Sequence, residues 1–319
     1  VAGPLAAAAA VAQLSGLDAR RTTHAIGIAG SQSSGVFEFL HAGATSKMLH
    51  GGWAALGGLV AAGLAGDGMT GPASILEGRN GLLAAFARRS DLAARMASQF
   101  DDLGARWAVT EVRPKIAPCC HYVQAFLEAL GGLLDKGLAA ADIRAIRCLV
   151  DSRTARLICE PWAEKLSPPT GYAAKWSLPY CLAARALRGA LTTQLFESAP
   201  DPELLAFARR IEWTPQDDGF PDRYAGRLVV TLADGKQMES AVSDVLGAPD
   251  RPFPESMLIE KFKSCAAAAL LPDAAAGLLL EIQGLAGASS LARLGGYLRS
   301  ARAAAPQRMQ ATAARVAAS

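Results

Sequence analysis

The spacing of hydrophobic and polar positions changes twice along the chain. In residues 1–105, apolar positions recur at the spacing of helices, and glycine-containing breaks separate the helical stretches. From residue 109 the spacing is mixed, and from Ser256 to Leu298 it is helical again. This order predicts a helical region, then a mixed α/β region, then further helices.

Local signals predict the individual elements. Asp18 is placed to cap a helix, and Asp234-Gly235 between two alternating stretches is the strongest β-hairpin signal in the chain. A long helix is predicted over Lys47–Leu64, with close packing expected at four glycines: Gly51, Gly52, Gly57 and Gly58. The other expected helices are Pro4–Leu14, Tyr122–Leu134 and Ser177–Arg188, and the expected strands are Val109–Pro114, Ile143–Val150, Arg227–Leu232 and Gln237–Val242.

We therefore expect an α+β fold in which a smaller α/β domain is inserted into a mostly helical domain. The predicted domains are a helical domain over 1–108, an α/β domain over 109–252, and C-terminal helices over 253–319 that return to the helical domain. The chain opens at Val1 inside a predicted helix rather than with a polar start. We therefore expect that a segment preceding Val1 is missing from the helical domain.

Composition narrows the classes of function. Hydrophobic residues make up 51% of the 319 positions, which is enough for a sizeable core. The net charge of +3 comes from dispersed Lys and Arg without a basic run, so no nucleic-acid partner is expected. The apolar run Gly51–Leu64 is short and rich in glycine for a membrane span, so no membrane association is expected.

The cysteines indicate a reducing environment. They lie at positions 119, 120, 148, 159, 181 and 265, and none belongs to a CxxC pair. This spacing argues against a zinc ribbon or a ferredoxin-type cluster. Scattered cysteines in apolar surroundings are typical of reduced thiols, so a cytoplasmic location is expected. Adjacent cysteines do not easily form a disulfide with each other, so Cys119 and Cys120 are expected to be free.

Four segments, in this order and at these spacings, resemble one known family. They are Ala25–Gly35 followed by Ser46–Ala55, which begins Ser46-Lys47-Met48-Leu49-His50, then Lys115-Ile116-Ala117-Pro118-Cys119-Cys120-His121, then Trp176-Ser177-Leu178-Pro179-Tyr180, then the strand Val229–Gly235 that ends in Asp-Gly. Together they span most of residues 1–265. On these segments the chain is identified as a member of the 2-methylcitrate dehydratase / cis-aconitate decarboxylase family (MmgE/PrpD).

The resemblance implies a helical domain and a smaller α/β domain with the active site between them. It implies no metal, no iron–sulfur cluster and no other cofactor, and usually a homodimer. It also implies that an upstream helical segment, before Ala2-Gly3-Pro4, contributes acidic and His residues. Reactions of the family remove a proton, water or CO2 next to a carboxylate, so a small polycarboxylate is the expected substrate.

Lys47 and His50 are the first candidate site residues. Without a metal, the groups that hold carboxylates must be Lys, Arg or His. Lys47 stands at a predicted helix start, and His50 lies three residues on, on roughly the same face. We interpret Lys47 as catalytic and His50 as substrate-binding, in a carboxylate clamp with a proton shuttle. The alternative is a solvated lysine and a histidine that bonds the backbone.

A second group of candidates lies in one loop. Lys115 precedes Cys120 and His121, and Pro114 and Pro118 stiffen the backbone between them. The interpretation is that Lys115 binds a carboxylate while Cys120 or His121, as catalytic residues, moves a proton; a thiol can do so if its pKa is lowered. The alternative is two small buried cysteines at the start of a helix that His121 caps. Decarboxylase-like members of the family carry His where this chain has Cys120, so His121 stands one position late.

The third segment adds Ser177 and Tyr180 at the start of a helix. The resemblance places Tyr180 near the substrate, so it is predicted as catalytic; a buried tyrosine with a hydrogen-bonded hydroxyl is an equal alternative. Ser177 is either a substrate-binding donor or the cap of the helix, and the cap is favoured.

Three functions remain open. The leading hypothesis is a cofactor-independent lyase of the 2-methylcitrate dehydratase / cis-aconitate decarboxylase type that acts on a small polycarboxylate. The second is an epimerase or racemase of a dicarboxylate on the same fold, with Cys120 as one of two proton carriers. The third is a truncated or non-catalytic homologue that folds and dimerises. Asp and His residues encoded upstream of Val1 would favour an enzyme, whereas a genuine start codon at Val1 would favour the third function.

Overall fold

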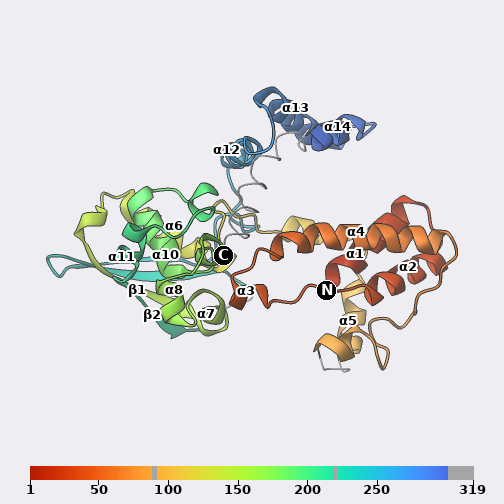
Figure 1. Ribbon diagram of the computed structural model, residues 1–319, viewed down its shortest axis with the longest axis horizontal. Coiled ribbons are helices and arrows are strands. Elements are labelled where there is room, and N and C mark those ends of the chain that lie inside the picture. Colours follow the sequence, from red (N-terminus) through yellow and green to blue (C-terminus); the bar gives the residue numbers. More distant parts are fainter. Residues whose placement is uncertain (88–91, 218–221, 301–319) are drawn as a thin grey trace, which may run out of the picture. The chain divides into compact units, whose positions relative to one another are not determined.

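The computed structural model describes residues 1–87, 92–217 and 222–300, and the chain divides into two compact units, Val1–Thr110 (unit 1) and Glu111–Ser319 (unit 2) (Figure 1). Within residues 1–87 and 92–110, the elements of unit 1 are all helical. They are α1 (Ala2–Leu14), α2 (Ala19–Ser31), α3 (Phe39–Ala42), α4 (Lys47–Gly66), the π-helix η1 (Leu83–Ala87), α5 (Leu92–Ala97), the 3-10 turn η2 (Ser98–Phe100) and, at the unit boundary, the 3-10 turn η3 (Ala108–Glu111).

Helices α1, α2 and α4 form the body of unit 1, and each packs against the other two. Asp18 accepts a hydrogen bond from the Arg21 N–H at 2.8 Å, which confirms the predicted cap of α2. Where α4 meets α1, a Cβ on Gly58 would lie 2.4 Å from the Cβ of Ala7, so only glycine fits there. The buried core between these helices consists of small residues: Ala8, Ala12, Ala25, Ile28, Ala29, Ala61, Ala62 and Ala65.

Helix α4 confirms the predicted long helix and extends it to Gly66. Close packing is confirmed at Gly57 and Gly58, which are buried, and is wrong for Gly51 and Gly52, which face open space on the outside of the helix. With 20 residues, α4 is long and apolar enough to cross a membrane by length and composition, so the sequence argument from a short run does not hold. A helix packed within a folded unit meets the same two criteria, and α4 packs along α1 and α2.

Unit 2 is built around a four-stranded sheet with the strand order β2-β1-β3-β4. Strand β1 pairs in parallel with β2 and antiparallel with β3, and β3 and β4 form a hairpin. Gly235 in the hairpin turn has a φ of 87°, which suits the predicted Asp-Gly turn. The predictions of β1 and of the hairpin are confirmed by the strand bounds: β1 (Ile143–Asp151), β2 (Ile211–Gln216), β3 (Gly226–Leu232) and β4 (Gln237–Val242).

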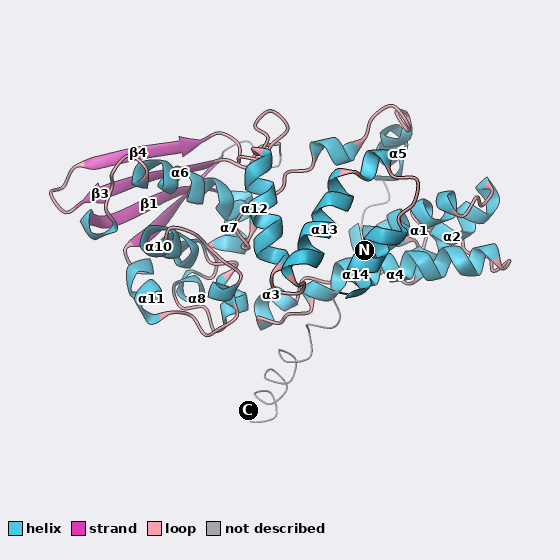
Figure 2. Cartoon of the chain, turned by 90° about the horizontal axis from the view of Figure 1, so that it is seen from above, coloured by secondary structure: helices cyan, strands magenta, loops and turns pink. Residues whose placement is uncertain are grey.

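Helices cover one face of this sheet (Figure 2). Helix α6 (Gln124–Leu134) packs on β3 and β4, and α10 (Leu178–Arg188) packs on α6. Residues of β1 alternate accordingly, since Ile146 and Cys148 are buried while Arg147 is exposed. The shorter helical elements around the sheet are η4 (His121–Val123), η5 (Ala140–Asp142), α7 (Ser152–Ile158), α8 (Trp162–Leu166), α9 (Gly171–Ala174), η6 (Gln194–Phe196) and α11 (Pro202–Ala208).

Two strands differ from the sequence-based expectation. The predicted strand Val109–Pro114 is wrong, because η3 occupies its first part and the side chains of Val109 and Val112 are exposed, so the alternation has no sheet face to bury. Strand β2 was not predicted, because Pro215 interrupts it and Ile211 is its only buried residue. A proline is tolerated there because β2 is an edge strand.

The C-terminal part of unit 2 is helical as predicted, with α13 packed against both α12 and α14. Helices throughout, with one small sheet, confirm the α+β class. The domain boundaries 1–108, 109–252 and 253–319, and the return of the last helices to the helical domain, stay predictions, and residues 301–319 lie outside the described residues. The bounds of these elements are α12 (Glu255–Ala266), α13 (Pro272–Gln283), η7 (Leu285–Gly287) and α14 (Ala292–Ser300).

Candidate active site

In unit 1, the predicted pair lies at the start of α4. Gly43, with a φ of 62°, ends α3, and a turn leads to Lys47, the first residue of α4. The Lys47 ammonium lies 5.8 and 5.4 Å from the ring centroids of Phe37 and Phe39, within the range of cation–π contact. His50 is half-buried, and its ring meets that of Phe39 edge-on at 5.6 Å. The two candidates are thus arranged around the same aromatic residue.

A cavity of about 720 Å³ opens beside this pair. Its wall includes His50, Phe37 and Phe39, so the two rings beneath the Lys47 ammonium line it, although Lys47 itself does not. Glu38 also lines the cavity and adds one negative charge to its wall. Unit 1 therefore offers a space for a small molecule next to a cation and an imidazole.

In unit 2, the loop that carries Lys115 is held by its own polar groups. The Lys115 Nζ donates to the Cys119 carbonyl oxygen at 2.6 Å. Gln124, in the first turn of α6, donates to the Ala117 carbonyl oxygen at 3.1 Å and accepts from the Ala117 N–H at 3.2 Å. Because Lys115 bonds the backbone at Cys119 and Gln124 bonds it at Ala117, the Lys115 ammonium is held near Cys119 and Cys120.

The thiols of this loop are buried, with 2% of Cys119 and 5% of Cys120 exposed, and both are free as predicted. Burial raises the pKa of the Cys120 thiol to about 11, although a backbone hydrogen bond at Tyr122 and the charges of Lys115 and Lys165 act in the opposite direction. Burial thus outweighs the nearby cations, and the thiol keeps its proton at neutral pH. The lowered pKa on which the predicted proton transfer by Cys120 depends is therefore not found, and the buried thiol can act only as a proton donor.

His121 follows directly, at the start of η4. Its Nε2 is buried and has no hydrogen-bond partner among the described residues. Burial, and then the charges of Lys115 and Arg113, lower the pKa of His121 to about 4 against an opposing effect of Asp244. The imidazole is therefore neutral at pH 7, with a buried nitrogen that can accept or donate a proton according to its tautomer.

The ion pair between Arg113 and Asp244 positions the Tyr224 ring against this imidazole. The Arg113 Nη2 donates to Asp244 Oδ2 at 3.0 Å, and Asp244 Oδ1 accepts from the Tyr224 N–H at 3.0 Å. Burial by itself would raise the pKa of the Asp244 carboxyl, but these bonds lower it, so the group stays ionised. The Tyr224 ring lies 4.6 Å from that of His121, so the pair fixes an aromatic wall against the imidazole.

Ser177 and Tyr180 have structural contacts. The Ser177 hydroxyl accepts from the Tyr180 N–H at 3.0 Å and donates to the Lys165 carbonyl oxygen at 2.6 Å, which confirms the favoured helix cap. Tyr180 is fully buried, and its hydroxyl accepts from the Asp201 N–H at 3.1 Å. This geometry fits the structural alternative for Tyr180, and a substrate contact of either side chain stays a prediction.

The structure brings three predicted residues together, Lys115, Cys120 and His121, in one loop of unit 2, whereas Lys47 and His50 lie in unit 1. Two further lysines near this loop were missed by sequence reasoning. The Cys120 N–H donates to the Lys175 carbonyl oxygen at 2.8 Å, and the Lys261 Nζ of α12 donates to the Lys115 carbonyl oxygen. Lys175 directly precedes the family segment at Trp176, which could have marked it. Lys261 lies 146 positions from Lys115, and no local signal points to it.

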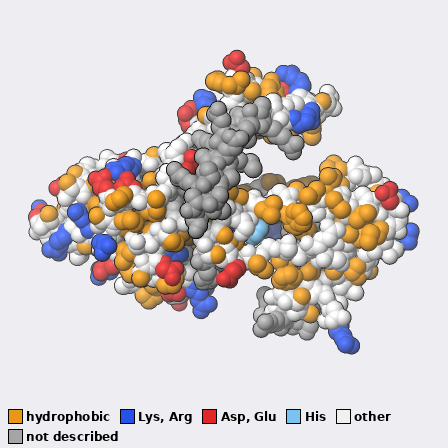
Figure 3. Space-filling view, viewed as in Figure 1, with side chains coloured by type: hydrophobic (Ala, Val, Ile, Leu, Met, Phe, Trp, Pro, Cys, Tyr) orange, Lys and Arg blue, Asp and Glu red, His pale blue; other side chains and the backbone are white. Residues whose placement is uncertain are grey.

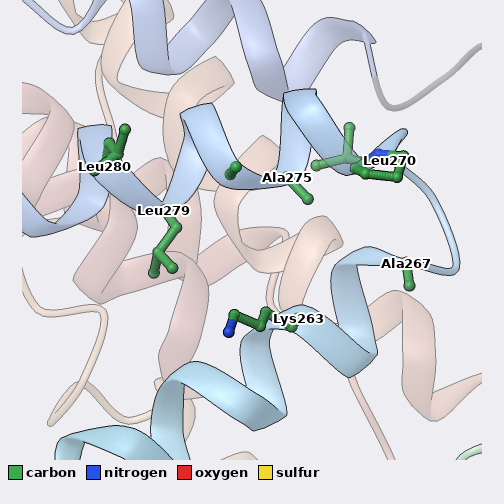
Figure 4. A pocket seen from close by; sticks show the side chains of 8 residues that line it. Lys263, Ala267, Leu270, Ala275, Leu279 and Leu280 are labelled. Atoms are coloured by element: carbon green, nitrogen blue, oxygen red, sulfur yellow. The ribbon is translucent and has the colours of Figure 1, made fainter.

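Two other features of the described residues do not form a catalytic site. A cavity of about 550 Å³ lies between α12 and α13, and Figure 4 shows Leu279 extending from α13 toward α12. Its lining is almost entirely aliphatic, and the Lys263 ammonium at its edge pairs with Glu260 at 3.0 Å, so it offers no acid or base. Within residues 1–87, 92–217 and 222–300, no three His, Cys, Asp or Glu side chains gather closely enough to hold a metal ion.

Comparison with known families decides where the chain belongs. Residues 1–95 match the MmgE/PrpD N-terminal domain, and residues 117–283 match the MmgE/PrpD C-terminal domain. The chain belongs to the MmgE/PrpD family. Of the candidate residues, Lys47 and His50 fall in the MmgE/PrpD N-terminal match, Cys120 and His121 fall in the C-terminal match, and Lys115 lies just before it.

Curated relatives with similar sequences carry a decarboxylase name. The cis-aconitate decarboxylase of Aspergillus terreus is 26% identical over 280 residues, which cover 83% of this chain and 57% of that protein. A cis-aconitate decarboxylase-like protein of Aspergillus oryzae is 27% identical over 281 residues, which cover 85% of this chain and 58% of that protein. This MmgE/PrpD chain therefore spans little more than half the length of these relatives.

Proposed function

We propose that this MmgE/PrpD chain is part of a cofactor-independent lyase that removes CO2 or water from a small polycarboxylate of the aconitate or 2-methylcitrate type. Family membership and the names of the relatives support the reaction class. The observation that carries the proposal is the Lys115 loop, where an ammonium group lies near a protonated thiol and a neutral imidazole.

Each group of the loop has a separate task in such a reaction. Lys115 holds a carboxylate of the substrate and stabilises the negative charge that develops next to it. When water is removed, His121, whose Nε2 has no partner among the described residues, takes up the proton from the substrate carbon, and its pKa of about 4 makes it a weak base. Cys120, which keeps its proton because of burial, supplies one to the carbon or hydroxyl group that needs it.

Unit 1 contributes Lys47 and His50 to this proposal. The cavity beside α4 accommodates a small acid, with Lys47 as the group that acts on the reacting carboxylate and His50 as a binding contact. A homodimer in the cytoplasm is part of the same expectation, and it rests on the family resemblance and on the cysteine pattern.

The proposal is tested by proton NMR in D2O with the complete gene product that contains this chain, given cis-aconitate or 2-methylcitrate. Loss of substrate with new alkene signals is the expected result. We expect Lys47→Ala to lower kcat by about 100-fold or more, as for the loss of one charge-stabilising group, and Lys115→Ala to act mainly by raising KM.

Lys236→Ala is the matched control, since Lys236 is exposed in the hairpin turn and pairs with Asp234 at 2.8 Å. Its kinetics should match those of the unmodified protein. Unchanged turnover in both Lys47→Ala and Lys115→Ala would refute the site. Deuterium incorporation without loss of substrate would replace the lyase by the epimerase, and silence with every substrate would favour the non-catalytic homologue.

A further inference from the structure

Three lysines far apart in the sequence contact one short backbone segment of unit 2, two through their ammonium groups and one through its backbone carbonyl oxygen. The Lys115 Nζ donates to the Cys119 carbonyl oxygen at 2.6 Å, and the Lys261 Nζ donates to the carbonyl oxygen of Lys115 itself. Lys175 is joined to the same segment because its carbonyl oxygen accepts from the Cys120 N–H at 2.8 Å. All three lysines are half-buried.

The charge of Glu197 acts on Lys175, but none of the three lysines forms an ion pair with a carboxylate of the described residues. The Asp244 carboxylate, whose charge acts on His121 of this loop, is already paired with Arg113. The Lys175 ammonium instead lies 5.5 Å from the ring centroids of Tyr172 and Phe196.

Besides burial, the charge of Lys115 lowers the pKa values of the other two lysines. Burial lowers the pKa of Lys175, and the charge of Lys115 lowers it further, with Glu197 acting in the opposite direction. Burial also lowers the pKa of Lys261, where the charge of Lys115 adds to the effect and the Cys265 thiol opposes it. Positive charges that interact in this way repel one another, and an anion that binds among them offsets the repulsion. The buried Nε2 of His121, which has no partner among the described residues, lies at the same loop.

We propose that Lys175 and Lys261 are further carboxylate-binding residues, and that with Lys115 they select a substrate bearing three carboxylate groups over one bearing two. The inference rests on the proposed function and makes it more specific. Three cations match three carboxylates, and a dicarboxylate leaves one half-buried ammonium unpaired, which is how a polar site rejects an analogue that lacks a group.

Binding rather than turnover tests this inference. Calorimetry with the complete gene product compares propane-1,2,3-tricarboxylate with glutarate, which has the same five-carbon chain between its ends and lacks the central carboxylate. Neither probe has the hydroxyl group or double bond needed for the reaction. We expect the tricarboxylate to bind about tenfold more tightly or better, the effect of one added charge-assisted hydrogen bond.

Substitutions assign the preference to the two lysines. Lys175→Met and Lys261→Met should each weaken tricarboxylate binding about tenfold while changing glutarate binding less, so the ratio of the two affinities falls. Lys263→Met is the matched control on α12, because Lys263 is exposed and pairs with Glu260. Lys261→Arg keeps a donor for the Lys115 carbonyl oxygen and should retain the preference, which separates lost binding from a disturbed loop.

Two results would overturn the inference, and they are distinguishable. An unchanged affinity ratio in both Met variants, with Lys115→Met still abolishing binding, removes Lys175 and Lys261 from the site and leaves the proposed lyase standing. No binding of either probe, together with no turnover of cis-aconitate or 2-methylcitrate, removes the proposed function and this inference together.

Discussion

The two units bury apolar surface in opposite ways. In unit 1, seven of the eight residues in the core cluster are alanine, and α1 approaches α4 until Gly58 faces the backbone of Ala7. In unit 2, the fully buried residues include large side chains such as Tyr180, Phe126 and Leu182. The large hydrophobic side chains of α4 are instead exposed: Met48, Leu49, Trp53, Leu56, Leu59, Val60 and Leu64.

This difference shows where each unit obtains its stability. The free energy gained by burial scales with the apolar area removed from water, so an alanine core contributes little per residue and depends on close fit. Figure 3 shows hydrophobic side chains gathered over α4, whereas charged side chains are interspersed over the sheet-containing part of unit 2. An apolar face of this kind is typical of a contact surface. The homodimer that the family resemblance implies would give it a partner.

The largest effect is expected from deleting a large side chain in unit 2. Phe126 is 2% exposed, so Phe126→Ala should lower the free energy of unfolding of unit 2 by about 3–5 kcal/mol, through lost burial and the cavity left behind. Leu56 of α4 is 48% exposed, and Leu56→Ala should change stability by about 0.5 kcal/mol or less. Hydrogen exchange followed by mass spectrometry reports both units separately. Similar losses from the two variants would mean that the α4 face is covered, either by another part of the chain or by a second copy.

A smaller effect is expected from adding a methyl group at the close contact between α1 and α4 in unit 1. Gly58→Ala places a methyl group 2.4 Å from the Ala7 Cβ, so α1 and α4 must separate, at a cost of about 1–3 kcal/mol. Gly63 lies on the same helix with open space around it, and Gly63→Ala should stabilise α4 by about 0.5–1 kcal/mol. Exchange rates of α1 and α4 peptides measure both changes. Faster exchange in neither variant would show that the helices can move apart without penalty.

The smallest effect is expected from pH, and it concerns unit 2. The buried polar side chains of the described residues all lie in that unit: Asp151, Thr154, Ser177 and Asp244. His121 has a folded pKa of about 4, below its ordinary 6.5, so the unfolded chain binds more protons between these values. The free energy of unfolding of unit 2 should therefore fall as pH decreases from 6.5 to 4, by on the order of 1 kcal/mol after discounting for partial exposure.

His121→Gln isolates this contribution, because it removes the titrating group and keeps hydrogen-bonding capacity. The difference in unfolding free energy between the variant and the unmodified protein should change over that pH interval and be constant above it. A difference that is constant throughout would show that the imidazole titrates alike in the folded and unfolded chain.

Much of the fold could be predicted where the signal is local. The Asp18 and Ser177 caps, the Asp234-Gly235 hairpin and strand β1 were all confirmed, because each is specified by a few neighbouring residues. Strand β2 could not be predicted, because its pairing with β1 is set by contacts far along the chain and Pro215 obscures its pattern. The predicted strand Val109–Pro114 was wrong because its alternating apolar and polar residues do not pair with any strand of the described sheet.

The candidate site was predictable to a similar degree. Motif spacing was enough to select the Lys115 loop with Cys120 and His121, but burial, which sequence does not show, keeps the thiol protonated and the imidazole neutral at pH 7. Lys261 reaches the loop only through the folding of α12, so no spacing rule would find it. Tyr180 matched a motif, yet its hydroxyl bonds the backbone of Asp201 inside the core.

The order of strands in the sheet also has a consequence during synthesis. Strand β1 lies between β2 and β3, but β1 ends at Asp151 while β2 begins at Ile211 and β3 at Gly226. Since ribosomes add roughly 5–20 residues per second, β1 emerges several seconds before either neighbour exists. During that interval the nascent chain presents an unpaired apolar strand, which invites pairing with other chains.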